Sequence, residues 1–321
     1  MIFMSQIDMN SVEFVRNSYE RLLDEVSKVI IGMEDVIEMV FIGLITRGHI
    51  LLEGVPGIAK TTLAKTIAKC LNLNFSRIQF TPDLLPADII GSYIFDQKSG
   101  KFYLRKGPIF ANIILADEIN RGNPKTQSAL LEAMQERQVT IEGNTLKLPD
   151  PFIVIATQNP IEVEGTYPLP TAQLDRFLAK VIMNYPNYED TIKVIKKYSS
   201  SFEVSVNPIL SGDDIIKMYS IVYSVHIDES ITRYIADIIE TSRKIPEVKL
   251  GVSPRGAIAL ALASKAEALI NGRDYVIPDD VKKVAPYVLN HRIFLTPTAI
   301  FEGITVQDII DKILSSVKVP T

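Results

Sequence analysis

The sequence predicts an α/β fold in which helices cover a parallel sheet, followed by a helical region. Three observations carry this prediction. Short, continuous apolar runs recur between residues 49 and 183, and helical patterns separate them. The first run leads directly into a glycine-containing loop and then into a helix. After Pro186 the apolar runs end and helical patterns dominate. We therefore expect two domains, residues 1–186 and 187–321, which suits a chain of 321 residues at roughly 150 residues per domain.

The first region is expected to begin with two helices. Apolar residues recur at helical spacing over residues 11–28, and a second helical pattern covers residues 34–46. Continuous apolar runs, rather than alternating ones, are typical of parallel strands that are buried on both faces. Five such strands are expected, at residues 49–53, 75–80, 112–116, 152–156 and 179–183.

Two antiparallel hairpins interrupt this alternation of strands and helices. Glycine or asparagine lies between β-prone runs, as tight turns require. The expected strand pairs are 92–95 with 101–104, and 139–141 with 146–148. In the second region we find no strong strand. Helices are expected there at residues 188–198, 213–223, 230–244, 254–270, 281–289 and 306–317.

Composition excludes several classes of protein. Lys plus Arg number 34 and Asp plus Glu 38, so the net charge is −4. This balance excludes a disordered polyanion and a strongly basic nucleic-acid coat protein. Cys70 is the single cysteine, so neither an intrachain disulfide nor a multi-cysteine zinc site can form. The three histidines are far apart and lack the spacing of metal ligands, so we expect no histidine metal cluster. The sequence has no apolar segment of about 18 residues and no signal-peptide pattern, so we expect no membrane span and a cytoplasmic location.

The loop after the first strand has the pattern of a phosphate-binding loop. Its glycines let backbone amides curl around phosphates, and the helix N-terminus adds partial positive charge. Lys60 is expected to reach the β- and γ-phosphates of ATP, and the Thr61 hydroxyl to bind Mg²⁺. Ala59 replaces a glycine of the general pattern, so a Cβ must fit there, which is tolerable if the local φ is negative. The alternative is a turn without a ligand, but placement between a buried strand and a helix favours nucleotide binding. The expected contacts are Gly54, Val55, Pro56, Gly57, Ile58, Ala59, Lys60, Thr61 and Thr62.

Polar side chains follow the third and fourth expected strands. Asp117 ends the third strand in the sheet that carries the loop, where it can hold the Mg²⁺. Glu118, one residue on, can polarise an attacking water. An acidic turn that caps the next helix is the alternative, but the coupling to the loop favours catalysis. Asn159 follows the fourth strand and would face the γ-phosphate if that strand lies between the other two. A turn before Pro160 explains Asn159 equally well.

Two arginines complete the set of candidate residues. Arg176 lies just before the fifth strand. Arg255 follows Ser253 and Pro254, which suit the N-cap and first position of a helix, so Arg255 is expected on the first turn, pointing outward. Each arginine alone is as readily explained as a solvated surface charge. Phosphoryl transfer, however, needs extra positive charge on the phosphates, often from a neighbouring subunit.

Together these residues resemble the AAA+ ATPases, and within them the MoxR group, over nearly the whole chain. MoxR proteins commonly carry alanine where Ala59 stands. The resemblance implies a central sheet in the order 5-1-4-3-2, with an all-α lid. It also implies that the two hairpins are a helix-2 insert and a pre-sensor insert, which face the ring pore or the substrate. The segments that carry the resemblance are 54–61, 117–121, 156–160, 174–177 and 253–256.

The resemblance also implies a homo-oligomeric ring, usually hexameric, with ATP between subunits. Asn159 then resembles the first sensor, Arg255 the second sensor, and Arg176 the finger that reaches the neighbour's γ-phosphate. Whether Arg255 acts within its own subunit stays open, and Arg121 is another candidate interface arginine. The adenine would lie near residues 29–32, which include Ile31 and Gly32.

The function implied by the resemblance is that of an ATP-hydrolysing, chaperone-like factor. Such a factor remodels or matures client proteins, often with a partner that bears a von Willebrand factor A domain. Two alternatives stay open. A DNA-translocating motor needs basic pore loops. The tip of the second hairpin, residues 142–145, has no basic residue, whereas residues 98–106 contain four. We therefore rank nucleic acid below a protein client. A switch that binds ATP with little turnover has no need of Glu118, yet the sequence retains it.

Overall fold

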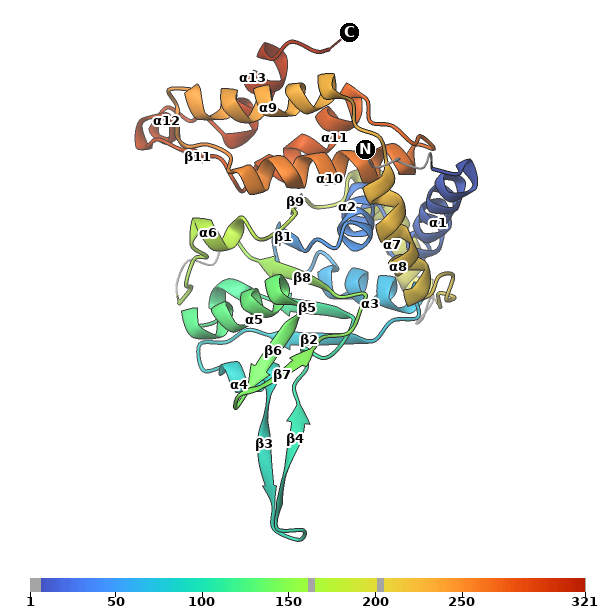
Figure 1. The fold of residues 1–321 in the computed structure, drawn as a ribbon, viewed down its shortest axis with the longest axis vertical. Helices are drawn as coiled ribbons and strands as arrows, with labels where there is room; N and C mark the ends of the chain where they lie inside the picture. Colours follow the sequence, from blue (N-terminus) through green and yellow to red (C-terminus); the bar gives the residue numbers. More distant parts are fainter. Residues whose placement is uncertain (1–6, 161–164, 201–204, 321) are drawn as a thin grey trace, which may run out of the picture.

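The computed structural model describes residues 7–160, 165–200 and 205–320. At its centre lies a five-stranded sheet in the order β2-β5-β8-β1-β9, in which every neighbouring pair is parallel (Figure 1). Counted along the chain as first to fifth, these strands have the order 5-1-4-3-2, so the predicted sheet is confirmed. The strands are β1 (Ile50–Gly54), β2 (Phe75–Gln79), β5 (Ile113–Asp117), β8 (Ile153–Gln158) and β9 (Ala179–Met183).

The central strands are buried on both faces, which explains their continuous apolar runs. In β1, Ile50 and Leu52 join one apolar cluster and Leu51 joins the other. Helices α1, α2 and α3 contribute to the first cluster, and α5 contributes to the second. The helices of this part of the chain are α1 (Met9–Ser27), α2 (Glu34–Ile45), α3 (Lys60–Cys70), α4 (Pro86–Ile90), α5 (Pro124–Glu136) and α6 (Thr171–Leu174), with a 3₁₀ turn η1 (Ile119–Arg121).

Both predicted hairpins are present. Strands β3 (Gly91–Asp96) and β4 (Lys101–Lys106) form an antiparallel ribbon that extends away from the sheet, at the bottom of Figure 1. Strands β6 (Gln138–Ile141) and β7 (Asn144–Lys147) form a shorter one. The longer ribbon carries a cross-strand pair of exposed rings, Phe95 and Phe102, whose centroids are 5.2 Å apart. Each ribbon forms a two-stranded sheet of its own and does not pair with the parallel sheet.

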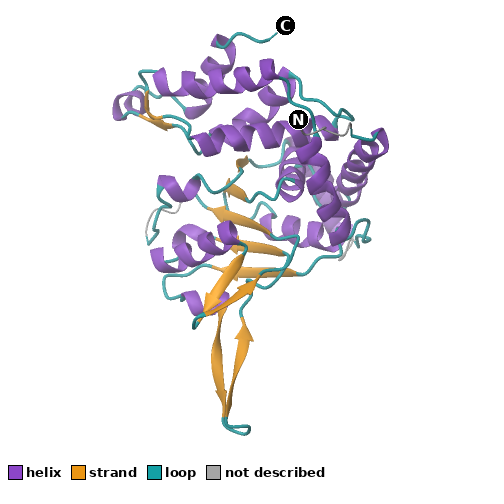
Figure 2. Cartoon of the chain, in the orientation of Figure 1, coloured by secondary structure: helices purple, strands orange, loops and turns teal. Residues whose placement is uncertain are grey.

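Helices dominate the chain after β9, as Figure 2 shows. The sequence shows no strong strand in this region, and the structure adds only a short antiparallel pair to the predicted helices, β10 (Val248–Leu250) and β11 (Phe294–Leu295), among the described residues. Strands of two or three residues are too short to show a periodic pattern in the sequence. The helices are α7 (Tyr188–Ser200), α8 (Gly212–Ser224), α9 (Glu229–Lys244), α10 (Pro254–Ile270), α11 (Pro278–Leu289), α12 (Pro297–Phe301) and α13 (Val306–Ser316).

The helical region packs directly on the sheet layer. Helix α10 contacts α1 and α2, α8 contacts α2, and α11 contacts β9. One apolar cluster runs through these contacts, so the helical region and the sheet share buried surface. The boundary at residues 186 and 187 stays a prediction. Within the described part of the chain, no helix combines the length and apolar character needed to cross a bilayer.

Candidate active site

The predicted phosphate loop joins the carboxyl end of β1 to the first turn of α3. Gly54 ends β1, and a Cβ there would lie 2.7 Å from the carbonyl oxygen of Met183 in β9. Glycine at this position therefore lets β1 and β9 approach each other. Gly57 has φ +84°, and a Cβ added to it would meet nothing within 4 Å. The space in front of Gly57 is thus open to a ligand, as a phosphate site requires.

The negative φ that would make alanine easily tolerable is not found at position 59. Ala59 has φ +61° and ψ +21°, in the left-handed region, and it stands immediately before α3. This conformation costs an L-residue roughly 1–2 kcal/mol. The loop has to reverse direction between β1 and α3 within five residues, and the surrounding packing imposes this turn on Ala59. Backbone strain of this kind is typical of functional loops.

Lys60 lies where the loop meets two acidic strand ends. Its Nζ donates a hydrogen bond of 2.5 Å to the carbonyl oxygen of Gly54. Burial lowers the pKa of the Lys60 ammonium, while the charges of Asp117, Glu118 and Glu53 raise it. The structure therefore brings Lys60 together with both carboxylates that the sequence predicted. Thr61 lies on the first turn of α3, next to Lys60.

Asp117 is fixed by partners on both neighbouring strands. Its Oδ1 accepts a 2.6 Å hydrogen bond from the Thr157 hydroxyl of β8. Its Oδ2 accepts bonds of 2.6 and 3.1 Å from the Arg77 guanidinium of β2. These contacts place the carboxylate at the carboxyl edge of the sheet, next to the phosphate loop.

Glu118 follows β5 in a left-handed conformation, with φ +56°. Its backbone N–H donates a 2.8 Å bond to the same Thr157 hydroxyl. Its carboxylate accepts bonds from Gln79 Nε2 at 2.9 Å and from Arg121 Nη1 at 3.1 Å. Thr157 thus orients both acidic residues, and Gln79 and Arg121 determine where the Glu118 side chain points.

Sequence reasoning missed Thr157, Gln79 and Arg77 as parts of this site. Gln79 stands opposite Asp117 because β2 pairs in register with β5, and the sequence carries no signal of this register. The sequence did single out the segment after β8, and Asn159 is buried there. Strand β8 lies between β5 and β1, which is the arrangement that the Asn159 prediction requires.

A cavity of about 420 Å³ adjoins the phosphate loop. Ile31 lines this cavity beside the loop, and Gly32 lines a neighbouring cavity that shares Met33, Tyr185 and Pro186 with it. Tyr198 of α7 closes one side and donates a 2.6 Å bond to the Val29 carbonyl oxygen. The described residues that line the cavity of about 420 Å³ are Val29, Ile30, Ile31, Met33, Gly57, Ile58, Ala59, Thr62, Tyr185, Pro186, Thr191, Val194 and Tyr198.

Arg176 and Arg255 line a second cavity, of about 430 Å³. This cavity also contains residues 46–49, which precede β1, and residues 175–178, which precede β9. It therefore lies at the amino edge of the sheet, whereas the phosphate loop lies at the carboxyl edge. The five residues of β1 separate the two edges by roughly 16 Å. The structure brings the two predicted arginines together and places both away from Lys60.

The fold and the site define a class of protein. The parallel sheet in this order, the phosphate loop after β1 and the carboxylates after β5 are the features of an AAA ATPase. Residues 49–179 match the ATPase family associated with various cellular activities (AAA), and residues 240–313 match the AAA lid domain.

Comparison with individual proteins identifies the family within this class. The chain is 43% identical over 319 residues to the chaperone MoxR1 of Mycobacterium tuberculosis, covering 95% of this chain and 83% of that protein. It is 30% identical over 302 residues to the protein MoxR of Paracoccus denitrificans, covering 84% and 86%. A crystal structure of a protein from Cytophaga hutchinsonii, described as an ATPase, has a TM-score of 0.91 and 45% identity, covering 97% and 98%. The chain belongs to the MoxR family of AAA ATPases.

Proposed function

We propose that this chain hydrolyses ATP with Mg²⁺ at sites shared between two copies in a ring, hexameric as the resemblance implies. The observation that supports this proposal is that the candidate residues of one chain lie at two opposite edges of the sheet. Lys60 and the two carboxylates lie at one edge of the sheet, and Arg176 and Arg255 lie at the other. A cationic face that cannot reach its own nucleotide suits the nucleotide of a neighbour.

The carboxyl edge fits a magnesium nucleotide. Backbone amides of the phosphate loop and the Lys60 ammonium would bind the phosphates, and the apolar cavity beside the loop would take the base. The Thr61 hydroxyl and an oxygen of Asp117 would hold Mg²⁺, since hydroxyl and carboxylate oxygens are the ligands that this ion prefers. The ion would supply charge neutralisation on the phosphates. Glu118 would polarise the attacking water, and Asn159 would orient it.

The amino edge supplies charge to the neighbour. Arg176 and Arg255 share one cavity with no residue of the phosphate loop in its lining, so we place both in trans. The sequence left this question open for Arg255, and action in trans is our proposal for it. Two guanidinium groups on the leaving phosphates stabilise the charge that develops during phosphoryl transfer.

We propose further that ATP turnover drives the remodelling or maturation of client proteins in the cytoplasm. A related protein bears the name chaperone MoxR1. The exposed rings of Phe95 and Phe102, on the ribbon that extends from the sheet, suit contact with a protein. A von Willebrand factor A domain protein is the partner class that we expect. Stimulation of the ATPase by DNA, lost at high salt, would instead identify a DNA motor.

The proposal is tested by complementation between two inactive variants. Glu118→Gln should bind ATP with magnesium but not hydrolyse it, and Arg176→Ala should stop turnover while the ATP affinity of the isolated subunit stays unchanged. Mixed rings contain interfaces with an intact Glu118 and an intact Arg176, so mixing should restore activity. Arg233→Ala removes an exposed arginine of α9 whose partner is Glu229, and it should leave turnover unchanged. Turnover by Arg176→Ala at the wild-type rate would refute the shared site.

A further inference from the structure

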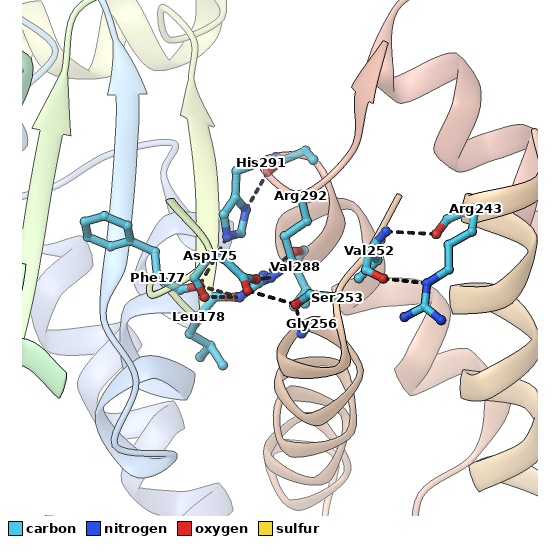
Figure 3. Close-up of polar contacts among 12 residues, drawn as sticks. Asp175, Phe177, Leu178, Arg243, Val252, Ser253, Gly256, Val288, His291 and Arg292 are labelled. Atoms are coloured by element: carbon cyan, nitrogen blue, oxygen red, sulfur yellow. Dashed lines mark hydrogen bonds and ion pairs between the residues drawn. The ribbon is translucent and has the colours of Figure 1, made fainter. Parts of the chain in front are cut away.

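One carboxylate joins the chain segments that carry both arginines of the amino edge. Asp175 directly precedes Arg176, and Figure 3 shows its side chain between the sheet layer and the helical region. Its Oδ1 accepts a 2.7 Å bond from Arg292 Nε, and its Oδ2 accepts a 2.8 Å bond from the Ser253 hydroxyl. Ser253 stands two residues before Arg255. Asp175 therefore contacts the start of the helix that presents Arg255.

The Arg292 guanidinium is the buried centre of this junction. Only 2% of its side chain is exposed. Besides Asp175, it donates to the carbonyl oxygens of Phe177 at 2.6 Å and Leu178 at 3.0 Å, and to that of Val288. Phe177 and Leu178 belong to the segment that leads into β9, so Arg292 holds that segment as well as the carboxylate. A planar guanidinium fixes several acceptors in one geometry, which a lysine could not do.

The first turn of α10 is seated against Arg292. Ser253 is the N-cap of α10, and its hydroxyl accepts a 3.2 Å bond from the N–H of Gly256 while it donates to Asp175. A Cβ on Gly256 would lie 2.8 Å from Cδ of Arg292. The helix start therefore contacts Arg292 more closely than any residue with a side chain would allow. This contact packs the helix turn that carries Arg255 against Arg292.

Charge explains why such a junction is needed. Arg47, Arg137, Arg176, Arg255 and Arg292 all line one cavity, and Asp175 is the acidic residue in its described lining. Burial lowers the pKa of Arg292, the contacts with Asp175 raise it, and the charge of Arg255 lowers it. Asp175 thus offsets repulsion between cationic groups that would otherwise push α10 away from the segment before β9.

We propose that Asp175 and Ser253 are positioning residues that hold Arg176 and Arg255 as one preformed cationic pair for the neighbour's ATP. This inference rests on the proposed function. Because the pair is fixed when the chain folds, no reorganisation is needed during phosphoryl transfer. The junction lies at the amino edge, so its loss changes turnover and leaves the phosphate loop intact.

The test measures kcat, KM and subunit ATP affinity for Asp175→Asn and Ser253→Ala. We expect kcat to fall about 10–100-fold in both, as misplacement by about 1 Å does. The ATP affinity of the isolated subunit should stay within about twofold, because the phosphate loop is untouched. Ser253→Thr keeps the hydroxyl and should restore most of the turnover. Thr305→Ala removes the N-cap hydroxyl of α13 and should leave kcat unchanged.

Complementation separates positioning from a folding defect. Asp175→Asn subunits retain Glu118, and Glu118→Gln subunits retain Asp175, so mixed rings should recover activity. If Asp175→Asn fails to fold, the comparison of Ser253→Ala with Ser253→Thr decides. Wild-type kcat in Asp175→Asn and Ser253→Ala, in rings that Arg176→Ala inactivates, would overturn this inference and leave the proposed function standing. Full turnover by Arg176→Ala would overturn both.

Discussion

Replacing Thr157 by valine should damage both acidic residues of the site at once. Thr157 is fully buried, and its hydroxyl donates to Asp117 Oδ1 at 2.6 Å while it accepts from the Glu118 N–H at 2.8 Å. Valine has nearly the same shape but no hydroxyl, so both hydrogen bonds disappear without a cavity. The substitution therefore measures the effect of losing the two hydrogen bonds, with side-chain packing nearly unchanged.

The expected cost follows from the two groups left without a partner. An unsatisfied buried polar group costs about 1–3 kcal/mol. Asp117 keeps the Arg77 guanidinium on its other oxygen, so the Glu118 N–H should account for most of the loss. We therefore expect a destabilisation of roughly 2–4 kcal/mol, or a fall in Tm of roughly 3–6 °C for a chain of 321 residues. The left-handed backbone at Glu118 also loses the bond that holds it.

The assay combines thermal unfolding with magnesium-dependent turnover. The chain contains no tryptophan, so unfolding is followed by far-UV circular dichroism. If Asp117 holds Mg²⁺ as proposed, loss of its hydrogen bond should weaken magnesium activation about 10–100-fold, and Thr157→Ser, which keeps the hydroxyl, should restore it.

The matched control is Thr140→Val, which removes an exposed hydroxyl whose hydrogen-bond partner among the described residues is Thr145 of the short β6–β7 ribbon. This change should stay within about 0.5 kcal/mol of wild type. If Thr157→Val matched this control in both Tm and magnesium dependence, Thr157 would not orient the acidic residues and the reasoning would be refuted.

Three further predictions concern the loop and a buried acid. Gly54→Ala places a Cβ 2.7 Å from the Met183 carbonyl oxygen, so Tm should fall by the equivalent of about 1–3 kcal/mol and ATP binding should weaken in a nucleotide titration. Ala59→Gly relieves the left-handed conformation and should stabilise the chain by up to about 1 kcal/mol; a lower Tm would contradict the strain. Burial, and then the nearby Glu38, raise the pKa of Glu267 to about 7. The folded state therefore favours the neutral acid, and the stability that this provides is lost as pH rises from about 4.5 to 7. Glu267→Gln should flatten the dependence of Tm on pH over that range, and an unchanged slope would show that another group titrates.

Much of the fold could be predicted because its signals are local. The β9 strand and α10 have the bounds that the sequence predicted. Continuous apolar runs identified β1, β5 and β8, which are buried on both faces, whereas β2 and β9 at the sheet edges are buried only in part. Ser253 and Pro254 identified the start of α10 from capping chemistry alone, and the structure shows the expected cap.

The residues of the candidate site were likewise predicted where their signal is local and missed where it is not. Lys60 and Asp117 were predicted together because a loop and a strand end at one sheet edge have a recognisable pattern. Gln79 and Thr157 were missed because their roles depend on strand register, which sets which side chains stand opposite Asp117. A single polar residue at a strand end carries no such information in the sequence.

The sequence by itself determined which chemistry the chain carries: a phosphate loop, two adjacent carboxylates and two arginines, each recognisable from its immediate neighbours. The tertiary structure decided how these groups are distributed, because the length of β1 separates Lys60 from Arg176 and Arg255 by a full strand. It also decided the left-handed turn at Ala59 and the junction at Asp175. The physical reason is that backbone direction and long-range contacts arise from packing the whole chain, whereas side-chain chemistry is fixed residue by residue.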